Sequence, residues 1–388
     1  MRFKTKTIGE VAEVQTGPFG SQLHKEDYVE AGTPIVTVEH LGQRRFSMQN
    51  LPRVKDCDRD RLLKYTLKTG DLVFSRVGSV DRISFVTDDE NGWMFSGRCL
   101  RLRVFGEIDA LWLYYFFCLE QTKQFVRNIA VGATMPSINT KLLSEVPVSY
   151  PENIADQRKI ASILSLIDDK IELNSTINHN LQQQAQALYH QIFCSMPHPD
   201  WRNGVLSDIA VVVMGQSPDG KSYNEDGIGT VFYQGRAEFG TRFPTQRLFT
   251  TEPKHMAQEN DVLISVRAPV GDLNVAKEDC CIGRGLGAVR SKDGHQSFVL
   301  YTMFALRSQL NVFNGEGTVF GSINRDSLNS LPVIIPPIAE INKFEALVAP
   351  MDKAIRTNYD EICHLQSLRD ALLPRLMSGE IDVSEVEL

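Results

Sequence analysis

Two kinds of hydrophobic pattern alternate along the chain. Residues 1–150 and 197–336 contain short alternating or β-branched runs bounded by Gly, Pro and Asp, which predict strands and turns with a few helices. After Pro151, and again after Pro337, the apolar positions take a helical period, and Gly and Pro become rare for about 35 residues. The pattern therefore predicts two globules of mixed α and β structure, each followed by one long helix.

The second half of the chain repeats the first. Landmarks recur at an offset that drifts from 198 to 184 residues, among them TIGEVA (7–12) as VLSDIA (205–210), GDLVFS (70–75) as NDVLIS (260–265), and SIN (137–139) as SIN (322–324). Each landmark keeps its order along the chain. A repeat of this length indicates a duplicated domain.

Both predicted helices contain one heptad seam, with apolar residues at alternating steps of four and three. In the first helix the seam consists of Ile160, Leu164, Ile167, Ile171, Asn174, Asn178, Leu181, Ala185, Leu188 and Ile192. Shifted by 184 positions, the second seam consists of Phe344, Val348, Met351, Ile355, Asn358, Ile362, Leu365, Arg369, Leu372 and Leu376. Two such helices from one chain would pack as an antiparallel coiled coil.

Two features of the predicted helices are not ordinary core packing. Asn174 and Asn358 are repeat equivalents near the helix midpoints, and a pseudo-two-fold axis would bring them close together. A polar residue in a seam lowers stability but fixes the register of the helices. Pro374 predicts a kink or an early end of the second helix, because proline lacks a backbone N–H.

The expected fold class is α+β, with two globules separated by an antiparallel pair of long helices in a pseudo-two-fold internal duplication. We expect four segments: a first globule at 1–150, a central helix at 151–196, a second globule at 197–336, and a C-terminal helix with an acidic tail at 337–388. The chain is long enough for more than one core.

Charge and cysteine content limit the functions and the cellular compartment that the sequence predicts. The formal net charge of −7 is the wrong sign for general coating of nucleic acid, so DNA binding would depend on local basic segments. Residues 41–70 contain eight Lys or Arg against three Asp. The seven cysteines are scattered without a CxxC pair, which fits a reducing cytoplasm.

No membrane segment is expected. The N-terminal residues lack the apolar run of a secretory signal. The longest apolar stretch, residues 110–119, is too short to cross a bilayer and predicts a buried aromatic helix.

Two glycine-rich motifs invite a nucleotide-binding interpretation. GQSPDGKS at 215–222 matches the P-loop pattern letter for letter, but a P-loop requires a helix from the Lys-Ser pair, and the sequence that follows is rich in turn residues. GRGLG at 283–287 continues as a predicted strand instead of a helix. We expect both to be turns close to DNA.

Other catalytic signatures are also weak. An adenine methyltransferase would be expected to contain an Asn/Asp-Pro-Pro-aromatic motif, whereas Pro336 and Pro337 stand between two isoleucines. His24 and His255 lack metal-ligand spacing. Asp219, Glu252 and Lys254 only faintly resemble a nuclease triad and are not assigned.

The chain resembles the specificity subunits of type I restriction-modification systems over almost its whole length. Besides the layout, the resemblance includes the segments that close each globule, LSEVPVSYPENIADQRKI (143–160) and LNSLPVIIPPIAEINKF (328–344). The second segment has Ile341-Asn342 where the first has Asp156-Gln157.

The resemblance implies a non-catalytic, DNA-reading protein. Each globule would be a target-recognition domain for one half of a bipartite site, and the helices would dock two adenine-methyltransferase subunits, which motor-nuclease subunits join. S-adenosylmethionine, ATP and Mg²⁺ would be held by those partners, and none of them by this chain. The alternatives are a DNA-reading subunit whose partner fuses methyltransferase and nuclease, and a methyltransferase or nuclease in its own right.

Base-reading side chains are expected on turns of the globules. Arginine reads guanine through two parallel hydrogen bonds, and Asn or Gln reads adenine. The candidates are Arg44, Arg45, Arg76 and Arg98 in the first globule, and Gln216, Tyr223, Arg236, Arg242, Arg267 and Arg284 in the second. Arg76 with Arg267, and Arg98 with Arg284, are favoured because the duplication contains both members.

Overall fold

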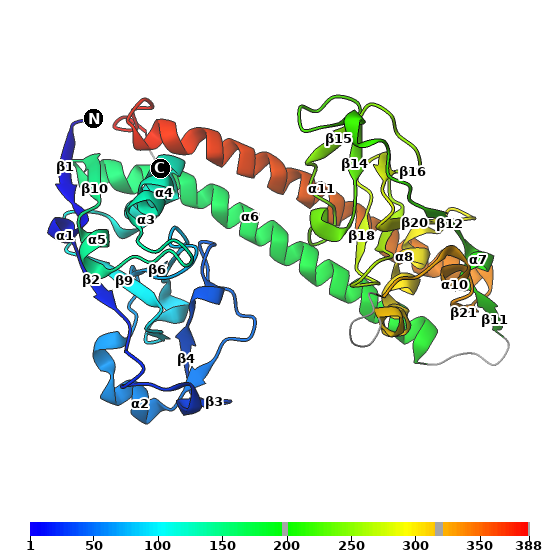
Figure 1. Cartoon of the computed structure of the whole chain (residues 1–388), viewed down its shortest axis with the longest axis horizontal. Coiled ribbons are helices and arrows are strands. Elements are labelled where there is room, and N and C mark those ends of the chain that lie inside the picture. The colour runs from blue at the N-terminus through cyan, green and yellow to red at the C-terminus, as the bar shows by residue number, and fades with distance from the viewer. Residues whose placement is uncertain (196–200, 315–320, 387–388) are drawn as a thin grey trace. The chain divides into compact units, whose positions relative to one another are not determined.

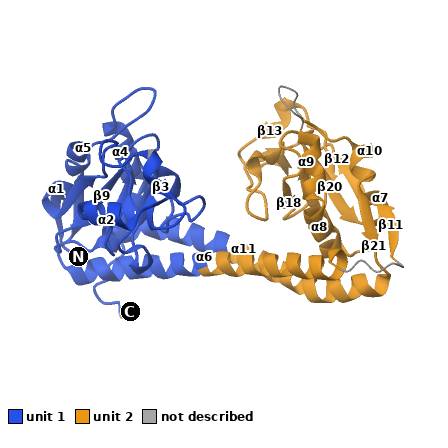
Figure 2. Ribbon diagram, turned by 90° about the horizontal axis from the view of Figure 1, so that it is seen from below, with its two compact units in different colours: residues 1–172, 362–388 blue, residues 173–361 orange. Residues whose placement is uncertain are grey.

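The chain folds into two compact units, coloured separately in Figure 2. The computed structural model describes residues 1–195, 201–314 and 321–386. Unit 1 comprises Met1–Glu172 with Ile362–Leu388, and unit 2 comprises Leu173–Glu361. Each unit therefore contains one globule together with parts of both long helices.

Unit 1 contains three small sheets (Figure 1). Strands β1 (Phe3–Thr7) and β10 (Pro147–Pro151) pair antiparallel and join the two ends of the globule. The central antiparallel sheet has the order β2 (Ala12–Thr16), β9 (Cys99–Val104), β6 (Leu72–Ser75), β7 (Ile83–Phe85). A third sheet has the order β3 (Tyr28–Val29), β5 (Arg53–Val54), β4 (Thr33–Val36), β8 (Met94–Phe95), with β4 and β8 parallel.

Unit 2 repeats this topology. The outer pair is β11 (Arg202–Val205) with β21 (Pro332–Ile335), and the central sheet has the order β12 (Ala210–Met214), β20 (Leu286–Ser291), β17 (Val262–Ser265), β18 (Leu273–Val275). The third sheet has the order β13 (Tyr223–Asn224), β15 (Leu248–Thr250), β14 (Thr230–Tyr233), β19 (Cys280–Ile282), β16 (Met256–Ala257). Among the described residues, β16 is the one added strand, and the parallel pair recurs as β14 and β19. The predicted duplication is confirmed strand by strand.

Short helices complete each globule. In unit 1 they are α1 (Ile8–Val11), α2 (Asp56–Arg61), α3 (Ala110–Cys118), α4 (Glu120–Ile129) and α5 (Thr140–Ser144). In unit 2 they are α7 (Leu206–Ile209), α8 (Gln296–Ala305), α9 (Arg307–Asn311) and α10 (Arg325–Asn329).

Helix α3 is the expected aromatic helix, and it is the centre of the core of unit 1. It begins at Asp109, whose side chain accepts the backbone N–H of Trp112 as an N-cap. Trp112, Leu113 and Tyr115 are buried against the central sheet. Burial of each large apolar side chain contributes roughly 1.5–3 kcal/mol, so this helix is a major source of stability. The described residues contain no helix long and apolar enough to span a membrane.

The two long helices are α6 (Ile154–Tyr189), followed by a π turn (His190–Cys194), and α11 (Ile338–Met377). Within unit 2 the two helices run antiparallel, because a higher residue number in α6 pairs with a lower one in α11: Asn174 bonds Glu361, and Asn178 bonds Asn358. In unit 1, Asp168 of α6 bonds Arg369 of α11. The expected antiparallel helix pair is thereby confirmed.

The expected early end of α11 at Pro374 is wrong, because the helix continues to Met377. Leu373, Leu376 and Met377, on the turn around Pro374, are buried in the core of unit 1. The burial of three large side chains outweighs the backbone hydrogen bond that proline removes, which costs about 3 kcal/mol.

Candidate nucleic-acid interface

In each unit the central sheet ends in a set of loops that we call the loop end. In unit 1 the loop end consists of residues 17–22, 76–79, 96–98 and 131–138. Its loops are tied together by backbone hydrogen bonds, from Arg76 N to Arg98 O (2.8 Å), Ile138 N to Arg76 O (2.9 Å) and Gly78 N to Pro136 O (2.8 Å). The antiparallel order of the strands therefore brings four distant segments of the chain to one surface.

The loop end of unit 2 consists of residues 215–219, 266–271, 282–285 and 321–323, and has the same hydrogen bonds. Val266 N donates to Gly285 O (2.9 Å), and Ile323 N donates to Val266 O (3.0 Å). Both loop ends also require a glycine after the first strand, since a Cβ at Gly17 or Gly215 would meet the backbone carbonyl of Ser96 or Gly283. The second loop end is therefore a copy of the first.

Four of the ten sequence candidates lie on these loop ends with their side chains exposed. They are Arg98 in unit 1, and Gln216, Arg267 and Arg284 in unit 2. Within the described parts of the chain, none of the three arginines makes a side-chain hydrogen bond or ion pair. Arg284 is held by its backbone instead, because its N–H donates to Ser217 Oγ at 3.2 Å.

Arg76 also lies on the loop end but is half-buried. Its Nη1 donates to Thr16 Oγ1 (3.3 Å) and to Gly97 O (3.2 Å), and its guanidinium lies 5.9 Å from the ring centre of Phe19. These contacts hold the loops together, and they leave the guanidinium only partly accessible.

The structure corrects the expected pairing of arginines across the repeat by one residue. The hydrogen bonds made by Arg76 in unit 1 are made by Val266 in unit 2, not by Arg267. In the same way, the counterpart of Arg98 is Gly285, one residue after Arg284. Successive side chains of an extended segment point to opposite faces, so a shift of one residue exposes Arg267 and buries Val266.

Arg44 and Arg45 lie away from the loop end and face helix α6. Arg44, with a side chain only 9% exposed, forms ion pairs with Asp169 and with Glu172. Burial alone would lower the pKa of Arg44, but the hydrogen bonds to Glu172 and Asp169 outweigh it and raise this pKa above its ordinary value. Arg45 pairs with Glu172 and donates to Thr87 Oγ1 at 2.6 Å.

The remaining candidates of unit 2 are also engaged within the protein. Arg242 is 7% exposed and forms an ion pair with Asp352 of α11. Arg236 is paired with Asp272. Tyr223 donates to Pro218 O at 3.1 Å and packs against Phe232. These placements favour structural roles for the three side chains.

Four arginines of the basic segment 41–70 form ion pairs with acidic side chains, whereas Lys55, Lys64 and Lys68 are exposed. Besides Arg44 and Arg45, Arg59 pairs with Asp60 and Arg61 pairs with Asp58. The three aspartates counted in the sequence thus lie within reach of the arginines beside them.

Neither glycine-rich motif leads into the helix that a nucleotide-binding loop requires, as the sequence suggested. Gly220–Ser222 is a single 3₁₀ turn followed by strand β13, so no helix starts at Lys221. The Asp219 side chain caps that turn by accepting the N–H of Lys221 at 2.9 Å. Strand β20 begins within the second motif, at Leu286. No group of His, Cys, Asp or Glu with the arrangement of a metal site occurs in the described residues.

Sequence analysis missed an apolar element of the loop end of unit 1. Phe19 and Met135 are 54% and 59% exposed, although both lie on loops fixed by backbone hydrogen bonds. The sequence signal for this element was a difference between the two repeats. Pro18-Phe19 follows Gly17 in the first repeat, whereas Gln216-Ser217 follows Gly215 in the second.

All twenty predicted seam positions are buried or half-buried. Ile192 falls in the π turn beyond the end of α6. Asn358, expected to lie close to Asn174, donates instead to Asn178 Oδ1 at 2.9 Å, while the Asn174 amide donates to Glu361 Oε2 at 2.8 Å. Asn178 in turn donates to Ile355 O at 3.2 Å, so a short polar layer interrupts the apolar seam in unit 2.

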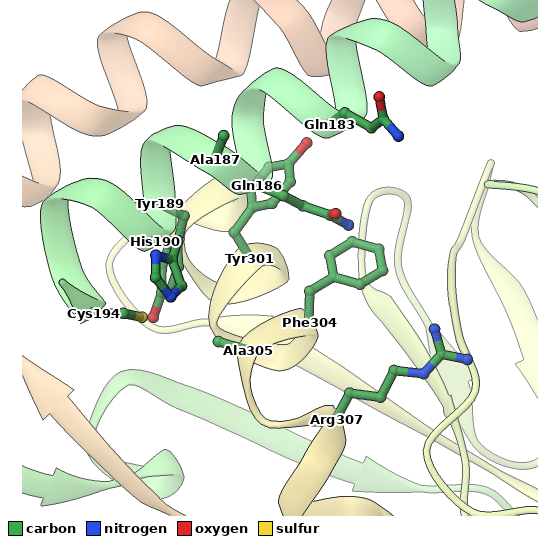
Figure 3. Close-up of a pocket in the computed structure, with 10 residues that line it drawn as sticks. All are labelled: Gln183, Gln186, Ala187, Tyr189, His190, Cys194, Tyr301, Phe304, Ala305 and Arg307. Atoms are coloured by element: carbon green, nitrogen blue, oxygen red, sulfur yellow. The ribbon is translucent and has the colours of Figure 1, made fainter.

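A cavity of about 460 Å³ lies in unit 2 between α6 and α8 (Figure 3). Tyr301 and Phe304 of α8 face Gln183 and Gln186 of α6, and Arg307, the first residue of α9, also lines the cavity. The lining has no grouping of acid, base and nucleophile that would indicate catalysis.

Comparisons with known proteins agree with this architecture. The family described as "Type I restriction modification DNA specificity domain" matches residues 2–183 and 199–355. A Methanocaldococcus jannaschii protein assigned as the MjaX specificity subunit of a type I restriction enzyme is 28% identical, covering 98% of this chain and 94% of that protein. The HindI specificity subunit of Haemophilus influenzae is 21% identical over 82% of this chain and 88% of its own length.

A solved structure supports the fold. The type I restriction-modification S subunit from M. genitalium superposes with a TM-score of 0.66 at 16% identity, covering 97% of this chain and 96% of that one. Members of the matched family supply DNA specificity and not catalysis. Because the family match extends over most of both units, the chain belongs to the family of type I restriction-modification DNA specificity subunits.

Proposed function

We propose that each unit reads one half of a bipartite DNA site through its loop end. Residues 1–150 and 197–336 would be the two target-recognition domains, and residues 151–196 and 337–388 the helices that connect them. The boundary at 196/197, and the last residue of the acidic tail at 380–387, fall outside the described residues. Arg98 in one domain, and Gln216, Arg267 and Arg284 in the other, are the proposed base or phosphate contacts.

The observation that carries this proposal is the recurrence, at the same end of two duplicated sheets, of exposed arginines whose side chains have no partner among the described residues. Most other candidate arginines are engaged by carboxylates, which satisfies their charge within the protein. The backbone of a hydrogen-bonded loop is positioned in advance, so little backbone order must be gained when its arginine binds. Arginine is also the residue best suited to guanine and to phosphate.

We assign Arg44 and Arg242 a different role in the same function. Each joins its domain to one of the long helices, Arg44 through Asp169 and Arg242 through Asp352. Rigid attachment of a domain to its helix would fix the direction in which the loop end faces. Loss of either arginine would then weaken recognition of a whole half-site instead of relaxing a single base.

The long helices are the proposed docking surface for two adenine-methyltransferase subunits, one per unit. Unit 1 exposes Leu166 and Leu368 on these helices, and unit 2 exposes Leu173, Ile177 and Leu347. Leu173 and Ile177 are four residues apart, so their exposed side chains lie on one helix face. Motor-nuclease subunits would join this complex, and the partners would hold S-adenosylmethionine, ATP and Mg²⁺.

The test is coexpression of the chain with the methyltransferase encoded beside it, followed by sequencing of methylated adenines. The wild-type pair should methylate one bipartite motif, whereas the purified chain alone should transfer no methyl group. Arg98→Ala should relax one half of the motif, and Arg284→Ala the other, with losses of about 1–3 kcal/mol for each base contact.

Arg2→Ala and Arg202→Ala are the matched controls. Arg2 precedes β1 and Arg202 begins β11, and both are exposed and lie outside the loop ends. Both controls should methylate the wild-type motif. If the loop-end variants also leave the motif and its methylation unchanged, the loop ends do not read DNA.

A further inference from the structure

The loop end of unit 1 holds an aromatic side chain in solvent on a rigid support. The carbonyl of Phe19 accepts the N–H groups of Gln22 (2.8 Å) and Leu23 (3.2 Å), which closes the turn. The next loop lies against this turn, since a Cβ at Gly97 would meet the carbonyl of Pro18. The backbone is therefore fixed, although the Phe19 side chain is 54% exposed.

A cation is anchored beside this ring. The Arg76 guanidinium lies 5.9 Å from the ring centre of Phe19 and is itself held by Thr16 and Gly97. The contact restricts the ring without covering it. The neighbouring loop adds exposed Met135, and Gly78 N donates to Pro136 O on the same loop. Unit 1 thus presents an apolar surface beside the exposed guanidinium of Arg98.

Unit 2 has polar side chains at the same place. Gly17 N donates to Cys99 O and Gly215 N donates to Leu286 O, so the two glycines are structural equivalents. The residues that follow are Pro18 and Phe19 in unit 1, but Gln216 and Ser217 in unit 2. Two copies of one fold therefore offer different chemistry to their ligands.

We propose that Phe19 makes an apolar contact with the 5-methyl group of a thymine in the half-site read by unit 1, whereas unit 2 reads its half-site with polar groups at this position. The inference rests on the proposed function of the loop ends. The thymine methyl is the one apolar group that a base pair displays in the major groove, so an exposed, preorganised phenyl ring matches it. Phe19 is thereby a specificity-determining residue of the first recognition domain.

The test uses the full chain in complex with its methyltransferase and a duplex that contains the motif identified by methylation sequencing. Each thymine of the motif is replaced in turn by deoxyuridine, which removes the methyl group and leaves the hydrogen-bonding edge unchanged. At one thymine of one half-site, the replacement should weaken binding about four-fold, the factor expected for one buried methyl group. Phe19→Ala should bind the thymine and uracil duplexes equally, and Phe19→Leu should retain part of the difference.

Phe105→Ala is the matched control. Phe105 is 62% exposed and follows the opposite end of strand β9, so its truncation should leave the thymine-to-uracil ratio unchanged. Thermal unfolding and size-exclusion chromatography show whether each variant is folded and assembled.

Three results would overturn the inference: a thymine-to-uracil difference that persists in Phe19→Ala, no such difference at any thymine with the wild-type complex, or loss of complex assembly in Phe19→Ala. In the first two cases, altered motifs in Arg98→Ala and Arg284→Ala would leave the proposed function of the loop ends intact. Unaltered motifs in both arginine variants would reject that function separately.

Discussion

The hydroxyl of Tyr301 donates a hydrogen bond of 2.8 Å to Asp352, and this bond joins the buried helix α8 to the long helix α11. The duplication contains the same bond in unit 1, where Tyr115 of α3 donates to Asp168 of α6 at 2.7 Å. Both tyrosines are buried, which raises their pKa well above its ordinary value and keeps the hydroxyls protonated as donors. A tyrosine-carboxylate bond is thus a repeated attachment of each recognition domain to its helix.

Asp352→Ala should destabilise unit 2 far more than Tyr301→Phe. Asp352 also neutralises buried Arg242, so its removal leaves an uncompensated charge that costs about 3–5 kcal/mol. Tyr301→Phe removes one hydrogen bond to a charged group, at a cost of about 1.5–3 kcal/mol, and Asp352 Oδ1 still accepts from Arg242. Urea unfolding followed by circular dichroism measures both.

Asp360→Ala is the control for this comparison, because Asp360 lies on the same helix but pairs with Lys277 at the surface. An exposed ion pair contributes about 0–1 kcal/mol. Equal losses in Asp352→Ala and Asp360→Ala would show that the buried pair with Arg242 does not form.

The cysteines should separate into fast and slow classes with a thiol-alkylating reagent at pH 8. Burial raises the pKa of Cys99 to about 12 and that of Cys118 to about 11, so both stay protonated at this pH and are shielded as well. Cys57 is exposed and should react first. Mass spectrometry of peptides over time gives the order, and raising the pH toward 11 should speed Cys118 before Cys99.

Unfolding in urea is the control for alkylation, since all seven cysteines should then react at similar rates. Rapid labelling of Cys99 in the folded protein would contradict the packing of β9 against the third sheet of unit 1.

Sequence reasoning predicted the features that depend on periodicity. The duplication and the seam each repeat a spacing over many residues, so one unusual residue such as Pro374 changes little. The contacts of single arginines depend on tertiary neighbours instead. Arg44 meets Asp169 only because the globule packs on α6, and no local pattern indicates that pairing. The one-residue shift between Arg76 and Arg267 likewise becomes visible only through backbone hydrogen bonds.

Asn358→Leu should destabilise the helix pair, whereas Asn178→Leu combined with Asn358→Leu should restore or exceed the wild-type stability. The single change leaves Asn178 Oδ1 without the amide that donates to it, at a cost of about 1–3 kcal/mol. The double change replaces both partners by apolar side chains. Thermal unfolding of the four proteins in a mutant cycle measures the coupling. The methylated motif should be the same in all four proteins, since no base contact is altered. A changed motif would contradict the expectation that the seam residues take no part in reading DNA.

Replacing residues 200–335 with the equivalent segment of a relative should change one half of the methylated motif and leave the other half alone. The structure adds a condition, because the core of unit 2 includes Tyr189 and Phe344 from helices outside the exchanged segment. Phe298 lies 5.9 Å from the Tyr189 ring, so donors with an aromatic residue at position 298 should fold and others should not. Methylation sequencing reads the result, and a change in both halves would show that the two domains do not read independently.

Adding one heptad to each long helix should increase the spacing between the two half-sites. The additions belong after Glu172 in α6 and after Glu361 in α11, where both helices pass from one unit to the other, so that each unit keeps its own contacts.

Seven residues add about 10 Å at 1.5 Å per residue, which corresponds to about three base pairs at roughly 3.4 Å each. The second half-site would also rotate by about 100° around the duplex, because a turn contains about 10.5 base pairs. Methylation should therefore fall even where the wider spacing is accepted. An extension of α6 alone is the control, since helices of unequal length cannot keep both the Asp168–Arg369 bond of unit 1 and the Asn178–Asn358 bond of unit 2, and it should abolish methylation at every spacing. Sequencing of methylated adenines in cells that contain the extended protein gives the spacer length. Methylation that continues at the original spacing would mean that the helices do not set the distance between the half-sites.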